Sequence, residues 1–203
     1  MNSAVAEQQA LFSGEQPGLP GLRYEPDFIA LGEERQLLEA IRSLPLHEAE
    51  YRGYTAKRRI VSYGAGYDFD ANELRPAPAV PDWLHPLRAR VARRLAVSTG
   101  KVTHALVTEY RPGTQLGWHR DVPDFASVVG VSLGTACRMR FRPYPPRRGQ
   151  NVVILDLAPR SMYLLTGEAR WKWQHGILPT PGLRYSITFR TLSERARNPA
   201  TDA

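Results

Sequence analysis

The 203-residue sequence contains a single cysteine, Cys137, and no long apolar run. One cysteine excludes an internal disulfide and a zinc site built from cysteines, and it fits a reducing compartment. A membrane helix needs about 18 or more consecutive apolar residues, so no transmembrane helix is expected. Residues 1–9 lack a basic stretch followed by an apolar core, so no signal peptide is expected either. We therefore predict a cytoplasmic protein.

Acidic residues are also in deficit. The chain has 20 aspartates and glutamates against 27 lysines and arginines, which gives a formal net charge of +7. This charge favours polyanionic partners such as nucleic acid, although a protein that is simply basic and soluble has the same composition. The hydrophobic content of 42% is enough for one domain with a sizeable core. We expect it to be a monomer.

The apolar spacing changes from helical to strand-like near residue 100. Residues 31–44 and 83–97 repeat apolar side chains every three or four positions, which predicts two helices. After residue 100, glycine, proline and asparagine separate short runs typical of strands at 102–110, 126–133, 137–142, 151–157, 161–165, 171–175 and 183–191. The pattern predicts an α+β, mainly β fold: a sandwich or jelly roll with N-terminal helices packed on one sheet.

The domain boundaries follow from composition. Residues 1–22 end in Gln-Pro-Gly-Leu-Pro-Gly and are interpreted as a weakly ordered tail. We assign residues 23–192 to a single domain whose jelly-roll core spans about 102–191, and residues 193–203 to a C-terminal tail.

Two histidines and one aspartate have the donor types of an iron site. His119 and Asp121 are two positions apart, so in an extended segment their side chains point to the same face. Taken alone, His-x-Asp often arises by chance on a surface loop, and His175 alone is more often a core histidine. Together the three offer two imidazoles and one carboxylate, the set that binds Fe(II) on one face and leaves positions open for other ligands.

The segment 183–190 alternates an apolar and a polar face. Arg184, Ser186, Thr188 and Arg190 share the polar face, which on an ordinary strand is exposed but in a jelly roll can line the interior. The Cα atoms of the two arginines would lie about 20 Å apart on a flat strand. They can therefore reach opposite ends of a small diacid, to whose carboxylates the planar guanidinium fork is matched.

These segments together resemble the AlkB family of Fe(II)/2-oxoglutarate dioxygenases. The matching stretches are Tyr110-Arg-Pro-Gly, His119-x-Asp121, His175-Gly-Ile and Arg184-Tyr-Ser-Ile-Thr-Phe-Arg190. The resemblance implies a double-stranded β-helix with the metal near its open mouth, and Fe(II), 2-oxoglutarate and O2 as cofactor and co-substrates. It also implies that His119, Asp121 and His175 bind the metal and are catalytic. By the same resemblance, Arg184 and Tyr110 hold the distal carboxylate of 2-oxoglutarate, and Arg190 lies by its keto-acid end.

Two positions depart from the family pattern. Thr108 stands where the family has an asparagine that contacts the co-substrate, so that contact is altered. Pro123 stands where the family has a second aspartate that helps to recognise the damaged base. The base preference is therefore left open.

Residues 51–69 interleave aromatic and cationic side chains. This mixture is typical of surfaces that stack on bases and bind phosphates, but also of an ordinary basic β-hairpin. The resemblance implies a nucleotide-recognition lid over a flipped base, and we predict substrate contacts from Tyr63, Tyr67, Arg58 and Arg59. Trp118 is added because on a strand it points away from the face of His119. We interpret His47, His85 and His104 as structural or surface residues.

The resemblance implies oxidative demethylation of N-alkylated bases, as in DNA or RNA alkylation repair, on single-stranded or flipped-base substrate. Two alternatives stay open at this stage. One is a 2-oxoglutarate-dependent hydroxylase of a protein or small molecule. The other is a nucleic-acid-binding module without catalytic activity.

Overall fold

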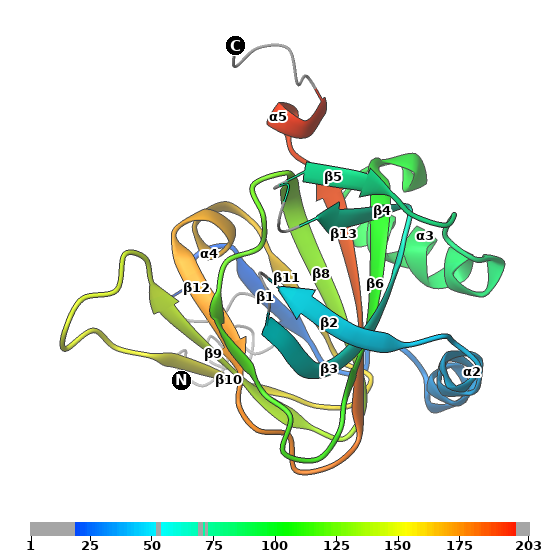
Figure 1. The fold of residues 1–203 in the computed structure, drawn as a ribbon, viewed down its shortest axis with the longest axis horizontal. Helices are drawn as coiled ribbons and strands as arrows, with labels where there is room; N and C mark the ends of the chain where they lie inside the picture. The colour runs from blue at the N-terminus through cyan, green and yellow to red at the C-terminus, as the bar shows by residue number, and fades with distance from the viewer. Residues whose placement is uncertain (1–18, 52–53, 69–70, 72, 198–203) are drawn as a thin grey trace, which may run out of the picture.

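The computed structural model describes residues 19–51, 54–68, 71 and 73–197, and two antiparallel β-sheets dominate it (Figure 1). The major sheet has seven strands in the order β1 (Leu22–Glu25), β11 (Met162–Leu165), β8 (Phe125–Gly134), β13 (Arg184–Leu192), β6 (Val102–Tyr110), β3 (Tyr54–Tyr63) and β2 (His47–Tyr51). The minor sheet has four, in the order β10 (Val153–Leu157), β9 (Cys137–Pro143), β12 (Trp173–Ile177) and β7 (Leu116–His119). A separate hairpin pairs β4 (Ala65–Asp68) with β5 (Glu73–Pro76).

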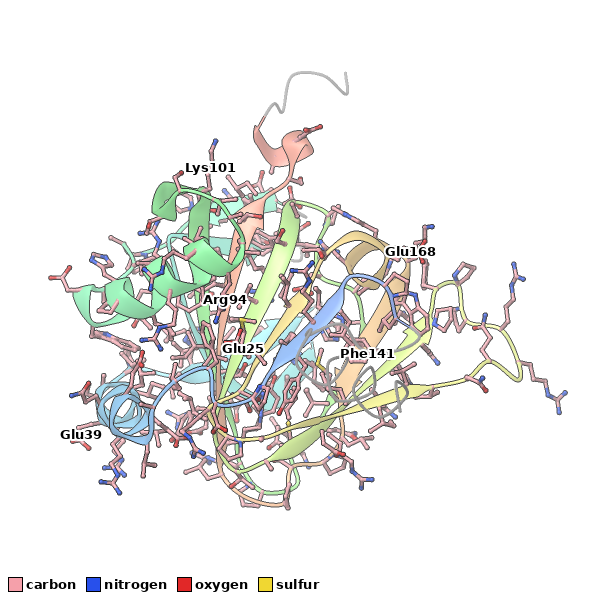
Figure 2. The ribbon with its side chains drawn as sticks, turned by 180° about the vertical axis from the view of Figure 1, so that it is seen from behind. Glu25, Glu39, Arg94, Lys101, Phe141 and Glu168 are labelled. Atoms are coloured by element: carbon pink, nitrogen blue, oxygen red, sulfur yellow. The ribbon has the colours of Figure 1, made fainter. Side chains whose placement is uncertain are left out.

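The two longer helices cover the face of the major sheet that is turned away from the minor sheet (Figures 1 and 2). The larger two are α2 (Leu31–Arg42) and α3 (His85–Arg94), and short helical turns lie at Asp82–Leu84, Thr99–Lys101, α4 (Gly167–Trp171) and α5 (Glu194–Arg197). None of the helices in the described segments is both long and apolar enough to span a membrane.

The two faces of the major sheet border two separate cores. Ile41 of α2 and Leu87 and Val91 of α3 are fully or almost fully buried against Ile187 and Phe189 of β13. Burying one such side chain stabilises the fold by about 1.5–3 kcal/mol. The second core lies between the sheets and includes Phe141 of β9, which is fully buried.

Strand β13 confirms the two-faced pattern seen in its sequence. It pairs with β6 on one side and β8 on the other, so it is central in the sheet. Its apolar residues face the helices, while Arg184, Ser186 and Thr188 are buried on the other face, with Arg190 partly buried at the end of the row. The polar face therefore lines the space between the sheets.

The jelly roll expected from the sequence is confirmed, with shifts at element ends. The strand predicted at 171–175 begins at Trp173 and continues to Ile177, because α4 occupies residues 167–171. A helix of five residues is too short to show a helical repeat in the sequence. Most of the two predicted tails falls outside the described residues; Leu19 and Leu22, at the end of the predicted N-terminal one, are buried in the second core.

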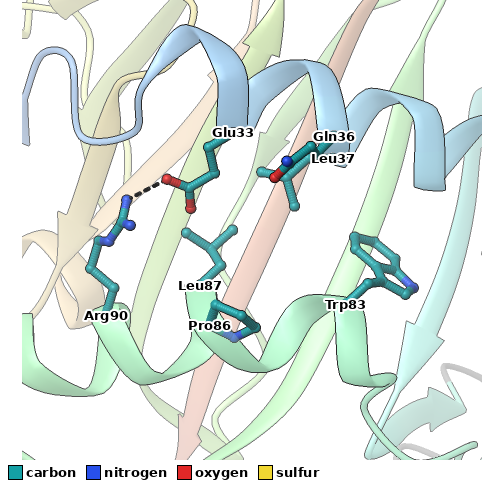
Figure 3. Close-up of a pocket in the computed structure, with 7 residues that line it drawn as sticks. All are labelled: Glu33, Gln36, Leu37, Trp83, Pro86, Leu87 and Arg90. Carbon is teal, nitrogen blue, oxygen red and sulfur yellow. Dashed lines mark hydrogen bonds and ion pairs between the residues drawn. The ribbon is translucent and has the colours of Figure 1, made fainter.

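A pocket of about 420 Å³ lies between α2 and α3 on the helical side of the major sheet (Figure 3). Leu37, Leu87 and Trp83 form much of its wall, and an ion pair between Arg90 and Glu33, with 2.8 Å between Nη1 and Oε2, closes one end. Since the polar face of β13 looks to the opposite side of the sheet, this pocket is separate from the site described below.

Candidate active site

The two histidines of the predicted triad face each other across neighbouring strands. His119 on β7 pairs in register with His175 on β12, and their ring centroids lie 4.3 Å apart. Asp121 follows β7 by two residues, and its Oδ2 lies 3.5 Å from Nε2 of His175. The fold therefore brings the three residues together, although 56 positions separate His119 from His175 in the sequence.

A glycine sets how closely these two strands approach. The register of β7 and β12 shifts between His175 and Ile177, which marks a bulge in β7, where Gly117 and Trp118 lie opposite Gly176. A Cβ atom at Gly176 would lie 2.7 Å from the carbonyl oxygen of Leu116 and 3.0 Å from that of Gly117. Only glycine fits this approach, which accounts for its place directly after the histidine.

Asp121 is held by an arginine through one oxygen only. Arg190 donates to Oδ1 from Nη2 at 2.7 Å and from Nε at 2.9 Å. Oδ2 is buried and has no hydrogen-bond partner among the described residues. A buried carboxylate oxygen without a partner is rare, and this one points toward His175, as a metal ligand would.

The protonation states suit metal binding, since ligands must be deprotonated. Burial, with a further contribution from His119, lowers the pKa of His175 to about 3, although Asp121 opposes the shift. Burial also lowers the pKa of His119. For Asp121 burial raises the pKa, but Arg190 and the two histidines outweigh it and hold the pKa well below its usual range.

The donor set thus fits Fe(II): two neutral imidazoles and an ionised carboxylate that lie close together. Among the described residues, no group of three histidine, cysteine, aspartate or glutamate side chains has the spacing of a formed metal site. The two histidine rings have their centroids 4.3 Å apart, and Oδ2 of Asp121 lies 3.5 Å from Nε2 of His175.

Arg184 lies at the other end of the polar row and is 1% exposed. Its Nε donates to Oγ of Ser132 at 3.1 Å, and its Cζ lies 4.9 Å from the centre of the Tyr110 ring. Its Nη1 is buried without a hydrogen-bond partner, and no described carboxylate forms an ion pair with it. Because an unpaired buried cation is costly, this is a place for an anion.

Tyr163 of β11 lies between the two arginines and is one of the residues that the sequence did not reveal. Burial raises its pKa, Asp121 and Tyr110 raise it further, and Arg184 and Arg190 oppose the rise, so the ring is near all four. Gly130 on β8 makes room for it, since a Cβ there would lie 2.2 Å from Cε1 of the ring. Its sequence context, Ser-Met-Tyr-Leu-Leu, carries no sign of this position.

Arg170 of α4 is a second residue that the sequence did not reveal. It is 3% exposed, and its Nη2 donates to the carbonyl oxygens of Val122 and Phe125 at 2.6 Å each. These bonds hold the segment that follows Asp121. A buried arginine on a five-residue helix has no signature in the sequence.

His104 was interpreted as structural, and the structure gives it a specific contact. It lies opposite Arg190 in the register of β6 and β13, and its Nδ1 is 3.2 Å from Nη1 of Arg190. Burial and the charge of Arg190 keep its pKa well below the ordinary value, so Nδ1 is free to accept the hydrogen bond. The ring also stacks on Phe125, with 4.8 Å between centroids.

We expect His104→Ala to weaken metal binding about 10- to 100-fold, the usual effect of losing a residue that orients a ligand. Arg190 loses one of its anchors and positions Asp121 less well. Titration with Co(II), followed by absorbance, measures this without turnover. His104→Gln keeps an acceptor and should restore much of the affinity, and His85→Ala, which removes a half-exposed histidine, is the control. Equal Co(II) affinity in His104→Ala and the unsubstituted protein would contradict this role.

The structure corrects part of the predicted lid. Tyr63 of β3 is 8% exposed and packs in the core on the helical side of the major sheet, so it does not face the site. The cause is strand parity, since Val61 and Tyr63 share the helix-facing side. Arg59 donates to the carbonyl oxygen of Leu46 and to Glu109, which makes it a structural anchor.

The other predicted contact residues lie in different parts of the fold. Arg58 is close enough to lower the pKa of His119 by its charge. Tyr67 is partly buried on β4. Thr108 is buried on β6 opposite Ser186 of β13. Trp118 lies on the outer face of β7, where Arg140 and Arg142 stack on it.

Comparison with known proteins decides the family. The model of the 2OG-Fe(II) oxygenase superfamily matches residues 22–190. The chain belongs to this superfamily. It is 30% identical over 182 residues to the Arabidopsis thaliana protein named "Alkylated DNA repair protein ALKBH8 homolog", covering 78% of this chain and 51% of the relative. It is 28% identical to the Escherichia coli "Alpha-ketoglutarate-dependent dioxygenase AlkB", covering 75% of this chain and 73% of the relative.

The structural comparison supports the same fold. "The structure of OsALKBH1" superposes with a TM-score of 0.67 at 16% sequence identity, over 87% of this chain and 99% of that one. The resemblance to AlkB-family proteins inferred from the sequence is thus confirmed. The chain spans about half the length of the Arabidopsis relative.

Proposed function

We propose that this superfamily member is an Fe(II)/2-oxoglutarate-dependent dioxygenase that oxidatively removes alkyl groups from nucleic-acid bases. The observation that carries the proposal is the buried, unpaired guanidinium of Arg184, on the same polar row as the arginine that holds Asp121. A small diacid bound between Arg184 and Arg190 satisfies both the charge and the hydrogen-bonding capacity of Arg184. Bound iron supplies O2 activation at His119, Asp121 and His175.

The chain's own residues bind and orient the reactants. Arg184 and Tyr110 hold the distal carboxylate of 2-oxoglutarate, with the hydroxyl of Ser132 fixing the guanidinium. Arg190 fixes Asp121 and lies by the keto-acid end. Overall, one O2 converts 2-oxoglutarate to succinate and CO2 and places one oxygen atom on the N-alkyl carbon. The resulting hemiaminal then releases an aldehyde and the unmodified base.

A nucleic-acid substrate is supported by charge and by the relatives. The protein has a net charge of +7, and Arg58 lies near the site from β3. The name of the Arabidopsis relative assigns that protein to the repair of alkylated DNA. A base within a duplex cannot reach a site between two sheets, so the substrate is a single strand or a flipped base.

The test is a panel of single-stranded DNA and RNA oligonucleotides, each with one N-methylated base, incubated with Fe(II) and 2-oxoglutarate and analysed by mass spectrometry. We expect demethylation of at least one base with equimolar succinate, and none with His175→Ala. Succinate formation without any change to a base would instead indicate a hydroxylase of protein or a small molecule. If no succinate forms with any substrate, the chain is a binding module.

A further inference from the structure

The outer face of the minor sheet carries a row of arginines. Along β9, Cys137, Met139 and Phe141 are buried, so by strand alternation the side chains between them point outward. Those side chains, together with Trp118 of the edge strand β7, form what we call the arginine face: Arg138, Arg140, Arg142 and Trp118.

Trp118 holds two of these arginines in place. The Cζ atoms of Arg140 and Arg142 lie 4.3 Å and 4.5 Å from the indole ring. Gly176 on β12 pairs with Arg140 and presents no side chain between β7 and β9. Nε of Arg142 also donates to Oε1 of Gln174 at 2.9 Å. Two stacked guanidiniums are thus fixed before any partner arrives, which reduces the entropy lost on binding.

Within the part of the chain that the structure describes, the arginine face lacks the acidic partners that other arginines have. Arg42, Arg90, Arg94 and Arg160 each form an ion pair with a carboxylate. Among the described residues no carboxylate forms an ion pair with any arginine of the face. Asp156 of β10, opposite Arg138 in register, is the acid nearest in the ladder, and it lies at the end away from Trp118.

Positive charge continues beyond the face toward the hairpin between β9 and β10. Arg120, next to His119, stacks on Tyr144 with its Cζ 3.9 Å from the ring centre. Arg147 and Arg148 are exposed in the hairpin, which extends away from the body of the protein on the side opposite α2 and α3 (Figures 1 and 2). Trp118 and His119 are neighbours on opposite faces of one strand, so the charged surface adjoins the site through β7 itself.

We propose that the arginine face binds the phosphate backbone of the single strand whose target base enters the active site. This inference rests on the proposed nucleic-acid substrate and adds a second contact region to it. Guanidinium is planar and bonds phosphate through two parallel N–H groups. Arg140 and Arg142 are two residues apart on one strand, which places them about 7 Å apart, a spacing comparable with that of successive phosphates on an extended strand.

The experiment measures how the binding of a long unmethylated oligothymidylate depends on salt. Arg140→Gln/Arg142→Gln removes two phosphate contacts, so the slope of log K against log salt should become shallower by about 1.4, at about 0.7 per contact for single strands. The matched control is Arg35→Gln/Arg93→Gln, which removes the same charge from exposed positions on α2 and α3. Its slope should stay at the wild-type value.

A second measurement compares KM for a methylated long oligonucleotide with KM for a methylated trinucleotide, which is too short to reach both regions. In Arg140→Gln/Arg142→Gln, but not in the control variant, KM for the long oligonucleotide should rise relative to KM for the trinucleotide.

An unchanged salt slope and an unchanged KM ratio, with demethylation intact, overturn the arginine face but leave the proposed function standing. If the salt slope depends on the two arginines but no base is demethylated, the arginine face stands and the proposed function is overturned. Loss of binding to polyglutamate but not to oligothymidylate would assign the face to an acidic protein segment and also overturn the inference.

Discussion

Asp121→Ala is expected to abolish Fe(II) binding and turnover and, in addition, to destabilise the fold. The carboxylate is one of the three proposed metal ligands and also neutralises Arg190, whose Nη2 lies 2.7 Å from Oδ1. Both side chains of this ion pair are largely buried, with 13% and 5% exposed. Removing one partner of a buried pair typically costs about 3–5 kcal/mol, so the midpoint of urea unfolding should fall together with the metal content.

His119→Ala separates the two effects. It removes a proposed metal ligand but leaves the Asp121–Arg190 ion pair intact, so metal content and turnover should be lost while the free energy of unfolding changes much less than in Asp121→Ala. Metal analysis and urea unfolding of both variants give the comparison. Near-normal turnover with unchanged metal content in either variant would refute the assignment of the ligands. Equal destabilisation of the two would show that the ion pair contributes little.

Arg184→Lys is expected to raise the KM for 2-oxoglutarate strongly while keeping the positive charge. Lysine lacks the planar fork and cannot both bond Ser132 and pair with a carboxylate in the way that Arg184 is placed to do. Loss of a charge-assisted hydrogen bond costs about 1–3 kcal/mol, which corresponds to a roughly 5- to 150-fold rise in KM. Binding of 2-oxoglutarate to the Mn(II)-loaded protein, measured by calorimetry, should weaken in parallel.

Two further variants sharpen this experiment. Ser132→Ala removes only the acceptor that fixes Nε of Arg184, so it should raise KM less than Arg184→Lys does. Arg35→Lys, at an exposed position on α2, should leave KM unchanged. If Arg184→Lys also leaves KM unchanged, the carboxylate anchor lies elsewhere, and Arg190 becomes the next residue to test.

The sequence alone determined the features that depend on local spacing or on residue type. The alternation of β13 predicted a polar face lining the interior, and the structure buries that face because both sides of a central strand in a two-layer fold are covered. His119, Asp121 and His175 could be proposed as iron ligands because few residue types bind Fe(II). Arg184 and Arg190 could be proposed to bind the co-substrate because of the resemblance to the AlkB family and because guanidinium matches carboxylate.

The tertiary structure decided everything that depends on the register between distant strands. His104 meets Arg190 because β6 and β13 pair at those residues, 86 positions apart. Tyr63 lies in the core on the helical side because a shift of one residue along a strand moves a side chain to the opposite face. Arg59 bonds Glu109 and the carbonyl oxygen of Leu46, and Arg58 lies near His119. Both placements depend on contacts between segments that are distant in the sequence. The arginines that stack on Trp118 come together only when β12 lies between β7 and β9, because pairing across a sheet is set by the packing of the whole chain.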